Sequence, residues 1–162
     1  MEVAILAAGC FWGVQYYFDQ VPGVTQTSVG YSGGHTKKPN YQQVCTHTTG
    51  HAEAVRIEFD PAMVTFNQLL KHYFRMHDPT QLNRQGYDIG DSYRSAIFYT
   101  SEIQHAAALE AIKFASKSNK FTSPIVTEVK PSAEFWPAED YHQKFAERTG
   151  RGICHTPYQK ID

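Results

Sequence analysis

Apolar side chains recur along the chain in two kinds of pattern. Continuous apolar runs and apolar residues at every second position predict the strands. Residues 3–8 form a continuous apolar run, which is typical of a buried strand over 2–8. Residues 52–59 alternate instead, so Glu53, Val55, Ile57 and Phe59 share one face of a half-buried strand. This alternation predicts that Glu53 points towards the apolar side. The same reasoning predicts further strands over 24–31, 93–99 and 125–129.

Spacings of three and four residues predict the helices. Thr65 and Gln68 have the spacing of a capping box at a helix start. Apolar residues then recur with helical period at Phe66, Leu69, Leu70, Tyr73 and Phe74. Ser101 and Gln104 indicate a second capped helix that runs to about Lys117. Shorter helical segments are expected over 10–20, 41–45 and 139–148.

The order of these elements favours an α+β fold. Helices and strands alternate, but the elements are short and loops such as 77–92 are long for a doubly wound sheet. We therefore predict a two-layer domain with a mixed sheet. The 162 residues are enough for a single domain, 1–162, with a substantial core. The glycine-rich tail from about 149 is predicted to be mobile.

Composition narrows the class of protein. The net charge is −1 with scattered Lys and Arg residues, which gives no electrostatic basis for binding nucleic acid or an acidic membrane surface. No apolar run approaches the roughly 18 residues of a membrane-spanning helix, and the start of the chain lacks a basic secretion signal. Three cysteines without a C-x-x-C pair exclude a disulfide scaffold. We expect a cytoplasmic protein.

Cys10 is the strongest candidate for chemistry. It follows the first predicted strand and a glycine, and it precedes Phe11 and Trp12 at a predicted helix start. The unpaired amides and positive dipole of a helix N-terminus favour thiolate over thiol, so Cys10 is a candidate nucleophile that opens onto an apolar pocket. The alternative is a buried, inert cysteine. Cys154, on the tail, could close a disulfide with an oxidised Cys10, or be an ordinary exposed cysteine.

Four polar residues are candidates to assist it. An apolar neighbourhood would raise the pKa of Glu53 and keep it protonated, so that it can serve as an acid; otherwise it is a strand-edge residue turned to water. Tyr41, Asp88 and Tyr93 lie in segments flanked by glycine or proline, where functional groups are common. Each phenol could donate to a bound oxygen, although tyrosines usually serve in packing.

Metal and nucleotide chemistry have little support in the sequence. Cys45, His47 and His51 have the spacing C-x-H-x-x-x-H, which lacks a fourth zinc ligand, and Cys45 is interpreted as structural. The other histidines are interpreted as solvated helix or loop residues. Neither G-x-G-x-x-G nor a Walker loop is present, so no nucleotide cofactor is predicted.

Six ordered blocks resemble the peptide methionine sulfoxide reductase A family. They begin with Gly-Cys-Phe-Trp-Gly around Cys10 and end with Phe-Trp-Pro-Ala-Glu-Asp-Tyr-His-Gln before Lys144. Between them lie residues 30–34, 39–45 and 49–53, and a block made of 84–90 and 93–95. The resemblance covers nearly the whole chain and implies a two-layer α/β sandwich with a ferredoxin-like core. It also implies reduction of the S epimer of methionine sulfoxide, free or in proteins.

The resemblance implies a role for each candidate residue. Cys10 would attack the sulfoxide sulfur while Glu53 protonates the oxygen, with Tyr41 and Tyr93 as hydrogen-bond partners and Asp88 in support. Phe11 and Trp12 would hold the methyl group. Cys154 would then resolve the Cys10 sulfenic acid as a disulfide, which thioredoxin or another dithiol reduces. No metal, flavin or other cofactor is implied, and we expect a monomer.

Three positions depart from the family pattern. His47 stands where the family usually has glycine, and Asp91 and Ser92 replace a small residue and a glutamine before Tyr93. Two other functions remain open on the residues alone. One is a Cys–His hydrolase with His51 or His142 as its base, and the other is a non-catalytic module that binds oxidised peptides in an aromatic cleft.

Overall fold

The computed structural model describes residues 1–153, and these form a sheet flanked by helices. The elements run in the order β1 (Glu2–Ala8), α1 (Phe11–Phe18), β2 (Val24–Ser32), α2 (Tyr41–Cys45), β3 (Ala52–Phe59), α3 (Phe66–Met76), β4 (Arg84–Gln85), β5 (Asp88–Ile89), the 3₁₀ turn η1 (Asp91–Tyr93), β6 (Ser95–Tyr99), α4 (Glu102–Lys117), β7 (Glu128–Pro131), β8 (Phe135–Pro137), η2 (Asp140–His142) and α5 (Phe145–Thr149). Cys154 lies outside the described residues.

Within residues 1–153 the main sheet has six strands in the order β7-β6-β1-β3-β2-β8. Only the pairing of β6 with β7 is parallel in this sheet, and the others are antiparallel. The prediction of a mixed sheet is therefore confirmed. The ferredoxin-like core that the resemblance implied stays a prediction. The register aligns Tyr31 of β2 with Glu53 of β3, so the centre of the sheet carries the buried carboxylate.

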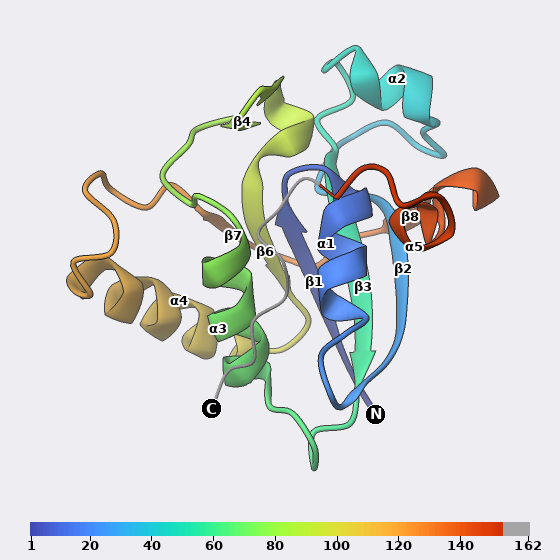
Figure 1. The fold of residues 1–162 in the computed structure, drawn as a ribbon. Helices are drawn as coiled ribbons and strands as arrows, with labels where there is room; N and C mark the ends of the chain where they lie inside the picture. Colours follow the sequence, from blue (N-terminus) through green and yellow to red (C-terminus); the bar gives the residue numbers. More distant parts are fainter. Residues whose placement is uncertain (154–162) are drawn as a thin grey trace.

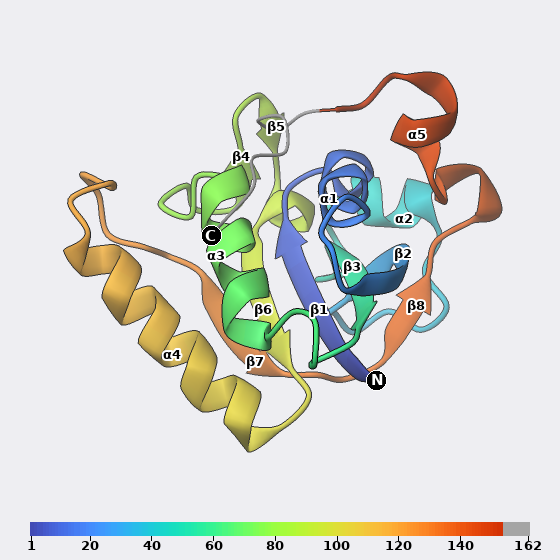
Figure 2. The same ribbon diagram turned by 60° about the horizontal axis from the view of Figure 1, so that its bottom comes forward.

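Helices α1 and α3 pack on the same face of the sheet (Figures 1 and 2). Their apolar side chains form one core cluster with alternate residues of β1, namely Ala4, Leu6 and Ala8. The intervening β1 residues Ile5 and Ala7 belong to a second, smaller cluster. Both faces of β1 are thus buried, as its continuous apolar run indicated. Burial of this strand fixes the position of the turn that follows it.

Several predicted boundaries are confirmed. The β1 and β3 ranges agree with the prediction, and α2 covers the predicted 41–45. At α3 the capping box is complete, because the Thr65 side chain accepts from the Gln68 amide and Gln68 accepts from Thr65. Ser101 caps α4, but the Gln104 side chain bonds to Thr100 and Val3 instead of closing a second box.

Other predicted boundaries were wrong. The helix predicted over 139–148 is interrupted, because Lys144 adopts a left-handed φ of 57° between η2 and α5. Strand β8, just before it, was not predicted. The predicted loop 77–92 contains the β4–β5 hairpin and η1, so the following strand begins at Ser95 and not at 93. The last predicted strand, 125–129, lies instead at Glu128–Pro131.

The loops at one end of the molecule bring the candidate residues together. Figure 1 places α2 and the β4 turn at the end of the sheet where β1 terminates. The C-terminal part of the described chain, with η2 and α5, returns to this end beside α1 (Figure 2). No helix among residues 1–153 has the length and apolar character needed to span a membrane.

Candidate active site

Cys10 stands at the junction of β1 and α1. Gly9 makes the turn between them with a φ of 95°, a conformation that glycine adopts with little strain. Cys10 is the N-cap residue of α1, because the helix begins at Phe11, one residue after the predicted start. Its side chain is buried, with 9% of its surface exposed. The thiol thus lies at the positive end of the helix, as the sequence indicated.

Glu53 lies beside the same helix end. It is the second residue of β3 and is 2% exposed. Its Oε1 accepts a hydrogen bond of 3.1 Å from the backbone N–H of Phe11, the first residue of α1. That amide is one of those without a partner inside the helix, so the carboxyl group satisfies it. The contact brings Glu53 next to Cys10 across 42 residues of sequence, and confirms that it points to the buried side.

Tyr41 and Tyr93 lie around this carboxyl group. Tyr41 is the first residue of α2, and Tyr93 ends η1. Burial and the negative charge of Glu53 raise the pKa of both phenols, and Cys10 and Asp88 contribute to the rise at Tyr93. The charge of Glu53 therefore acts on both tyrosines, and that of Cys10 acts on Tyr93. Both phenols stay protonated at neutral pH and can donate hydrogen bonds.

Asp88 occupies the edge of this arrangement. It lies in β5 and lines a cleft of about 700 Å³ with His77, Gln85 and Tyr87. Burial raises the pKa of its carboxyl group. Its negative charge contributes to the raised pKa of Tyr93.

Aromatic rings form a wall next to Cys10. Phe11 is buried, with its ring centroid 5.8 Å from that of Tyr31. Trp12 is half-buried and stacks on Phe145 at 4.0 Å. Its indole N–H donates a 2.9 Å hydrogen bond to Nδ1 of His142. An apolar surface of this kind can accommodate a methyl or methylene group.

Two residues hold this wall and Tyr41 in place, a role that the sequence analysis did not assign to either of them. His142 is buried against the rings of Phe11, Trp12 and Tyr41. Burial lowers its pKa, although the charge of Glu139 acts in the opposite direction. The ring is therefore neutral at pH 7 and its Nδ1 can accept from Trp12. The run of polar residues from 139 to 143 in the last family block was the available signal, but it was interpreted as a helix.

Glu139 is the second of these residues. It accepts hydrogen bonds from the Tyr31 phenol at 2.9 Å and from the Tyr41 backbone N–H at 3.0 Å. Burial raises its pKa, but these hydrogen bonds outweigh that effect and the pKa is lowered. Glu139 is thus an anion that fixes the start of α2 and with it Tyr41.

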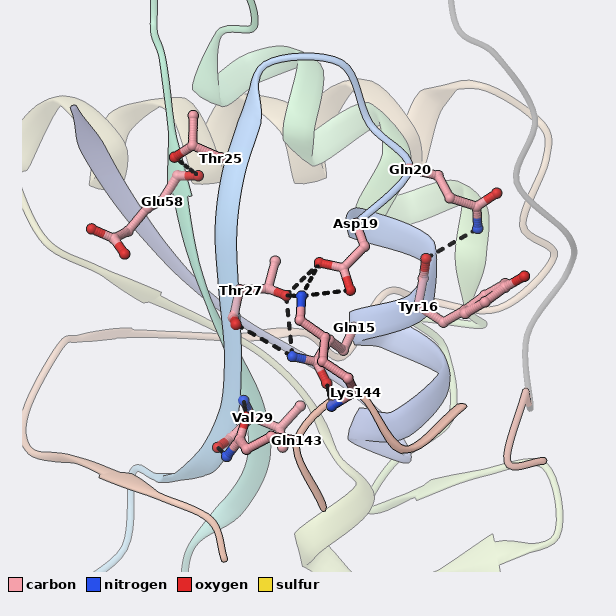
Figure 3. A network of polar contacts seen from close by, with 10 residues as sticks. All are labelled: Gln15, Tyr16, Asp19, Gln20, Thr25, Thr27, Val29, Glu58, Gln143 and Lys144. Carbon is pink, nitrogen blue, oxygen red and sulfur yellow. Dashed lines mark hydrogen bonds and ion pairs between the residues drawn. The ribbon is translucent and has the colours of Figure 1, made fainter. Parts of the chain in front are cut away.

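A polar network anchors the segment that carries Glu139 and His142 (Figure 3). The Gln143 amide donates to the Val29 carbonyl and accepts from the Val29 N–H, both at 2.9 Å. It thus continues the pairing of β2 beyond the end of β8. The Lys144 backbone donates to Gln15, and its ammonium group bonds Asp19 at 2.8 Å. These contacts tie the segment to α1 and β2.

The remaining cysteine and histidine candidates have structural contacts. Cys45 is half-buried and shares a hydrogen bond with Tyr41. His51 is buried, and its two ring nitrogens contact the Gly34 N–H at 3.0 Å and the Thr36 carbonyl at 2.7 Å. His51 is thus occupied in holding the loop after β2. No group of three or more potential metal ligands lies within residues 1–153.

Comparisons with known proteins agree with this geometry. A family model described as peptide methionine sulfoxide reductase matches residues 2–162. Peptide methionine sulfoxide reductase MsrA of Methanosarcina acetivorans is 55% identical over 150 residues, which are 93% of this chain and 80% of that protein.

Solved structures are similar over nearly the whole chain. Reduced Mxr1 from Saccharomyces cerevisiae gives a TM-score of 0.89 at 29% identity, covering 98% of this chain and 92% of that one. Methionine sulfoxide reductase A of Corynebacterium diphtheriae gives 0.87 at 37% identity, with 94% and 77% covered. The chain therefore belongs to the peptide methionine sulfoxide reductase family and is an oxidoreductase of the MsrA type.

Proposed function

We propose that this protein reduces the S epimer of methionine sulfoxide, free or in proteins, with Cys10 as its nucleophile. The observation that carries the proposal is the hydrogen bond from the Phe11 amide to Glu53, which joins the carboxyl group to the helix end that holds Cys10. A sulfoxide oxygen is a poor leaving group unless it is protonated. An acid beside the nucleophile is therefore what this chemistry needs.

The proposed reaction uses each of these residues. The Cys10 thiolate attacks the sulfoxide sulfur and forms an S–S bond to it, while Glu53 protonates the oxygen and the S–O bond breaks. The hydroxide that leaves adds to the Cys10 sulfur and breaks the S–S bond, which releases methionine and leaves Cys10 as a sulfenic acid. Tyr41 and Tyr93 donate hydrogen bonds to the oxygen during the transfer, and Asp88 supports Tyr93. Phe11 and Trp12 hold the methyl group and so select one epimer.

Two further thiol steps complete the cycle. The Cys154 thiol attacks the sulfenic acid, which releases water and leaves a Cys10–Cys154 disulfide. Thioredoxin or another dithiol then reduces this disulfide, so two electrons pass from the dithiol to each sulfoxide. Thioredoxin is supported by the yeast relative Mxr1, which has been solved in a complex with Trx2. The pathway requires no metal or flavin.

Turnover of the two separated epimers with thioredoxin or dithiothreitol tests the function. We expect reduction of the S epimer alone, and equal rates for both epimers would contradict the assigned selectivity. Cys10→Ser abolishes reduction, and retained turnover would exclude Cys10 as the nucleophile. Cys154→Ser allows about one turnover with thioredoxin, and sustained cycling would remove Cys154 from the mechanism.

The hydrolase alternative has less support, because His51 uses both ring nitrogens in loop contacts and His142 Nδ1 accepts from Trp12. Hydrolysis of an acyl substrate without any reductant would restore that alternative.

A further inference from the structure

His47 lies at the junction of two segments of the site. Helix α2 ends at Cys45, and His47 follows with a left-handed φ of 60°. Its N–H donates to the Val44 carbonyl at 3.0 Å, which closes the helix end. A glycine would adopt this backbone conformation without strain, whereas a side chain is disfavoured there. Histidine therefore occupies a position whose backbone conformation favours glycine.

The His47 ring packs against the turn that carries Tyr93. A Cβ atom built on Gly90 would lie only 2.2 Å from the ring, so the turn approaches it as closely as glycine permits. Nδ1 of His47 is 3.2 Å from the Ser92 hydroxyl and 3.7 Å from Oδ1 of Asp91. The ring also meets Tyr93 edge-on, with the ring centroids 6.1 Å apart.

The contact joins the segments that bear the two phenols. Tyr41 begins the helix that His47 follows, and Tyr93 comes directly after Ser92. Ser92 is 1% exposed, so its hydroxyl is held in one place by its surroundings. The three departures from the family pattern, at 47, 91 and 92, therefore meet in a single contact between the two segments.

We propose that His47 is a positioning residue that fixes the spacing of the Tyr41 and Tyr93 phenols through its contact with Ser92 and Asp91. The inference rests on the proposed function, in which both phenols bind the sulfoxide oxygen. His47 itself does not touch the substrate. It acts by holding the 90–93 turn against the end of α2, so that Tyr93 is correctly placed before the oxygen acquires charge.

Steady-state reduction of methionine S-sulfoxide by His47→Gly tests this role. Because the phenols matter most in the transition state, we expect kcat to fall about 3- to 10-fold, as for loss of one hydrogen bond, with KM nearly unchanged. In a Tyr93→Phe background the same substitution should change kcat less than about twofold, since the hydroxyl that it positions is already gone. The melting temperature should stay equal or rise, because glycine relieves the left-handed backbone.

Asn119→Gly is the matched control. Asn119 also has a left-handed backbone, with a φ of 62°, but it follows α4 away from the site. Asn119→Gly should leave kcat unchanged. If Asn119→Gly lowered kcat as much as His47→Gly, the loss would be a general effect of glycine at a left-handed position, and the inference would be overturned. Ser92→Ala removes the partner instead. It should reproduce the His47→Gly loss, and the double variant should lose no more than either single one.

The inference fails if both His47→Gly and Ser92→Ala keep full kcat, or if the His47→Gly loss is undiminished in the Tyr93→Phe background. If His47→Gly does not fold, Ser92→Ala in both backgrounds decides the same question. These results differ from failure of the proposed function itself, in which the unmodified protein would not reduce the sulfoxide and both proposals would fall.

Discussion

The hydrogen bond between Trp12 and His142 gives a quantitative prediction for the aromatic wall beside Cys10, which we propose binds the substrate methyl group. His142→Phe keeps an aromatic ring of similar size but removes the Nδ1 acceptor of the indole N–H. Trp12 is half-buried, so its N–H can turn to water only if the ring shifts. A net hydrogen bond is worth about 0.5–1.5 kcal/mol, so the KM for methionine S-sulfoxide should rise about 2- to 10-fold.

The expected change in stability is smaller. Nε2 of His142 is buried and has no hydrogen-bond partner within residues 1–153, so replacing the ring by phenyl also removes an unsatisfied nitrogen. This gain offsets part of the lost bond to Trp12. The free energy of unfolding should therefore change by less than about 1 kcal/mol, or about 2–4 °C in melting temperature.

The pH dependence of KM distinguishes loss of the Trp12–His142 hydrogen bond from a change in side-chain packing around position 142. Burial lowers the pKa of His142, so the ring gains its proton only below the usual histidine range of about 6.5. Because the pKa is lowered, the His142 ring is neutral at pH values above the usual histidine range, and its Nδ1 accepts the Trp12 hydrogen bond in full. This hydrogen bond is lost as the pH falls through the pKa of His142 in the folded protein. The KM of the unmodified protein should therefore rise on acidification towards the KM of His142→Phe. The KM of the variant should not show this pH dependence, because the variant has no imidazole at position 142.

Steady-state kinetics between about pH 5 and 8 provide the measurement, because this interval spans the ordinary histidine pKa. His105→Phe is the control, since His105 lies on α4 and stacks on Tyr99. It should leave both KM and its pH profile unchanged. Unchanged KM in His142→Phe at every pH would refute the reasoning that this hydrogen bond orients Trp12 for substrate binding.

Two further predictions concern the acid and the core. In Glu53→Gln the amide oxygen can still accept from the Phe11 N–H, so the fold should persist while single-turnover methionine formation slows about 10²- to 10⁴-fold; an unchanged rate would make Glu53 structural. His72 is 4% exposed, and burial and the charge of Arg75 lower its pKa to about 4. Because this pKa is depressed on folding, up to about 3 kcal/mol of stability should be lost between pH 6.5 and 4. Urea unfolding of His72→Phe should show a flatter pH profile, and an equally steep one would contradict the assignment.

The sequence predicted those parts of the site whose position depends on local pattern. The apolar run before Cys10 indicates a strand buried on both faces, and the alternation around Glu53 indicates the side on which that residue is buried. Both predictions hold in the structure. The capping residue that the sequence indicated at Thr65 acts on an amide three positions away, so its signal is also local. The β4–β5 hairpin could have been found too, because Gly86 at the first turn position, with its φ of 60°, is typical of a type II′ turn.

The segment after β8 could not be predicted in this way. Its polar residues find their partners more than 90 positions away, as Gln143 does at Val29 and Glu139 at Tyr41. Lys144 takes a left-handed backbone because its main chain and ammonium group are both bound to α1, at Gln15 and Asp19. A helical reading of 139–148 satisfied the local pattern, but tertiary hydrogen bonds outweighed it.

The long-range contacts also explain why this site depends on the whole fold. Strand β1 and the turn at Gly9 place Cys10 at the start of α1. Glu53 reaches the same helix end because β3 pairs with β1. Tyr41 is fixed by Glu139 from the far end of the chain. Each group alone is an ordinary residue in an ordinary element. What they share is a position at one helix N-terminus, where the buried Glu53 carboxyl group accepts from the first amide of α1 and Cys10 is the N-cap residue.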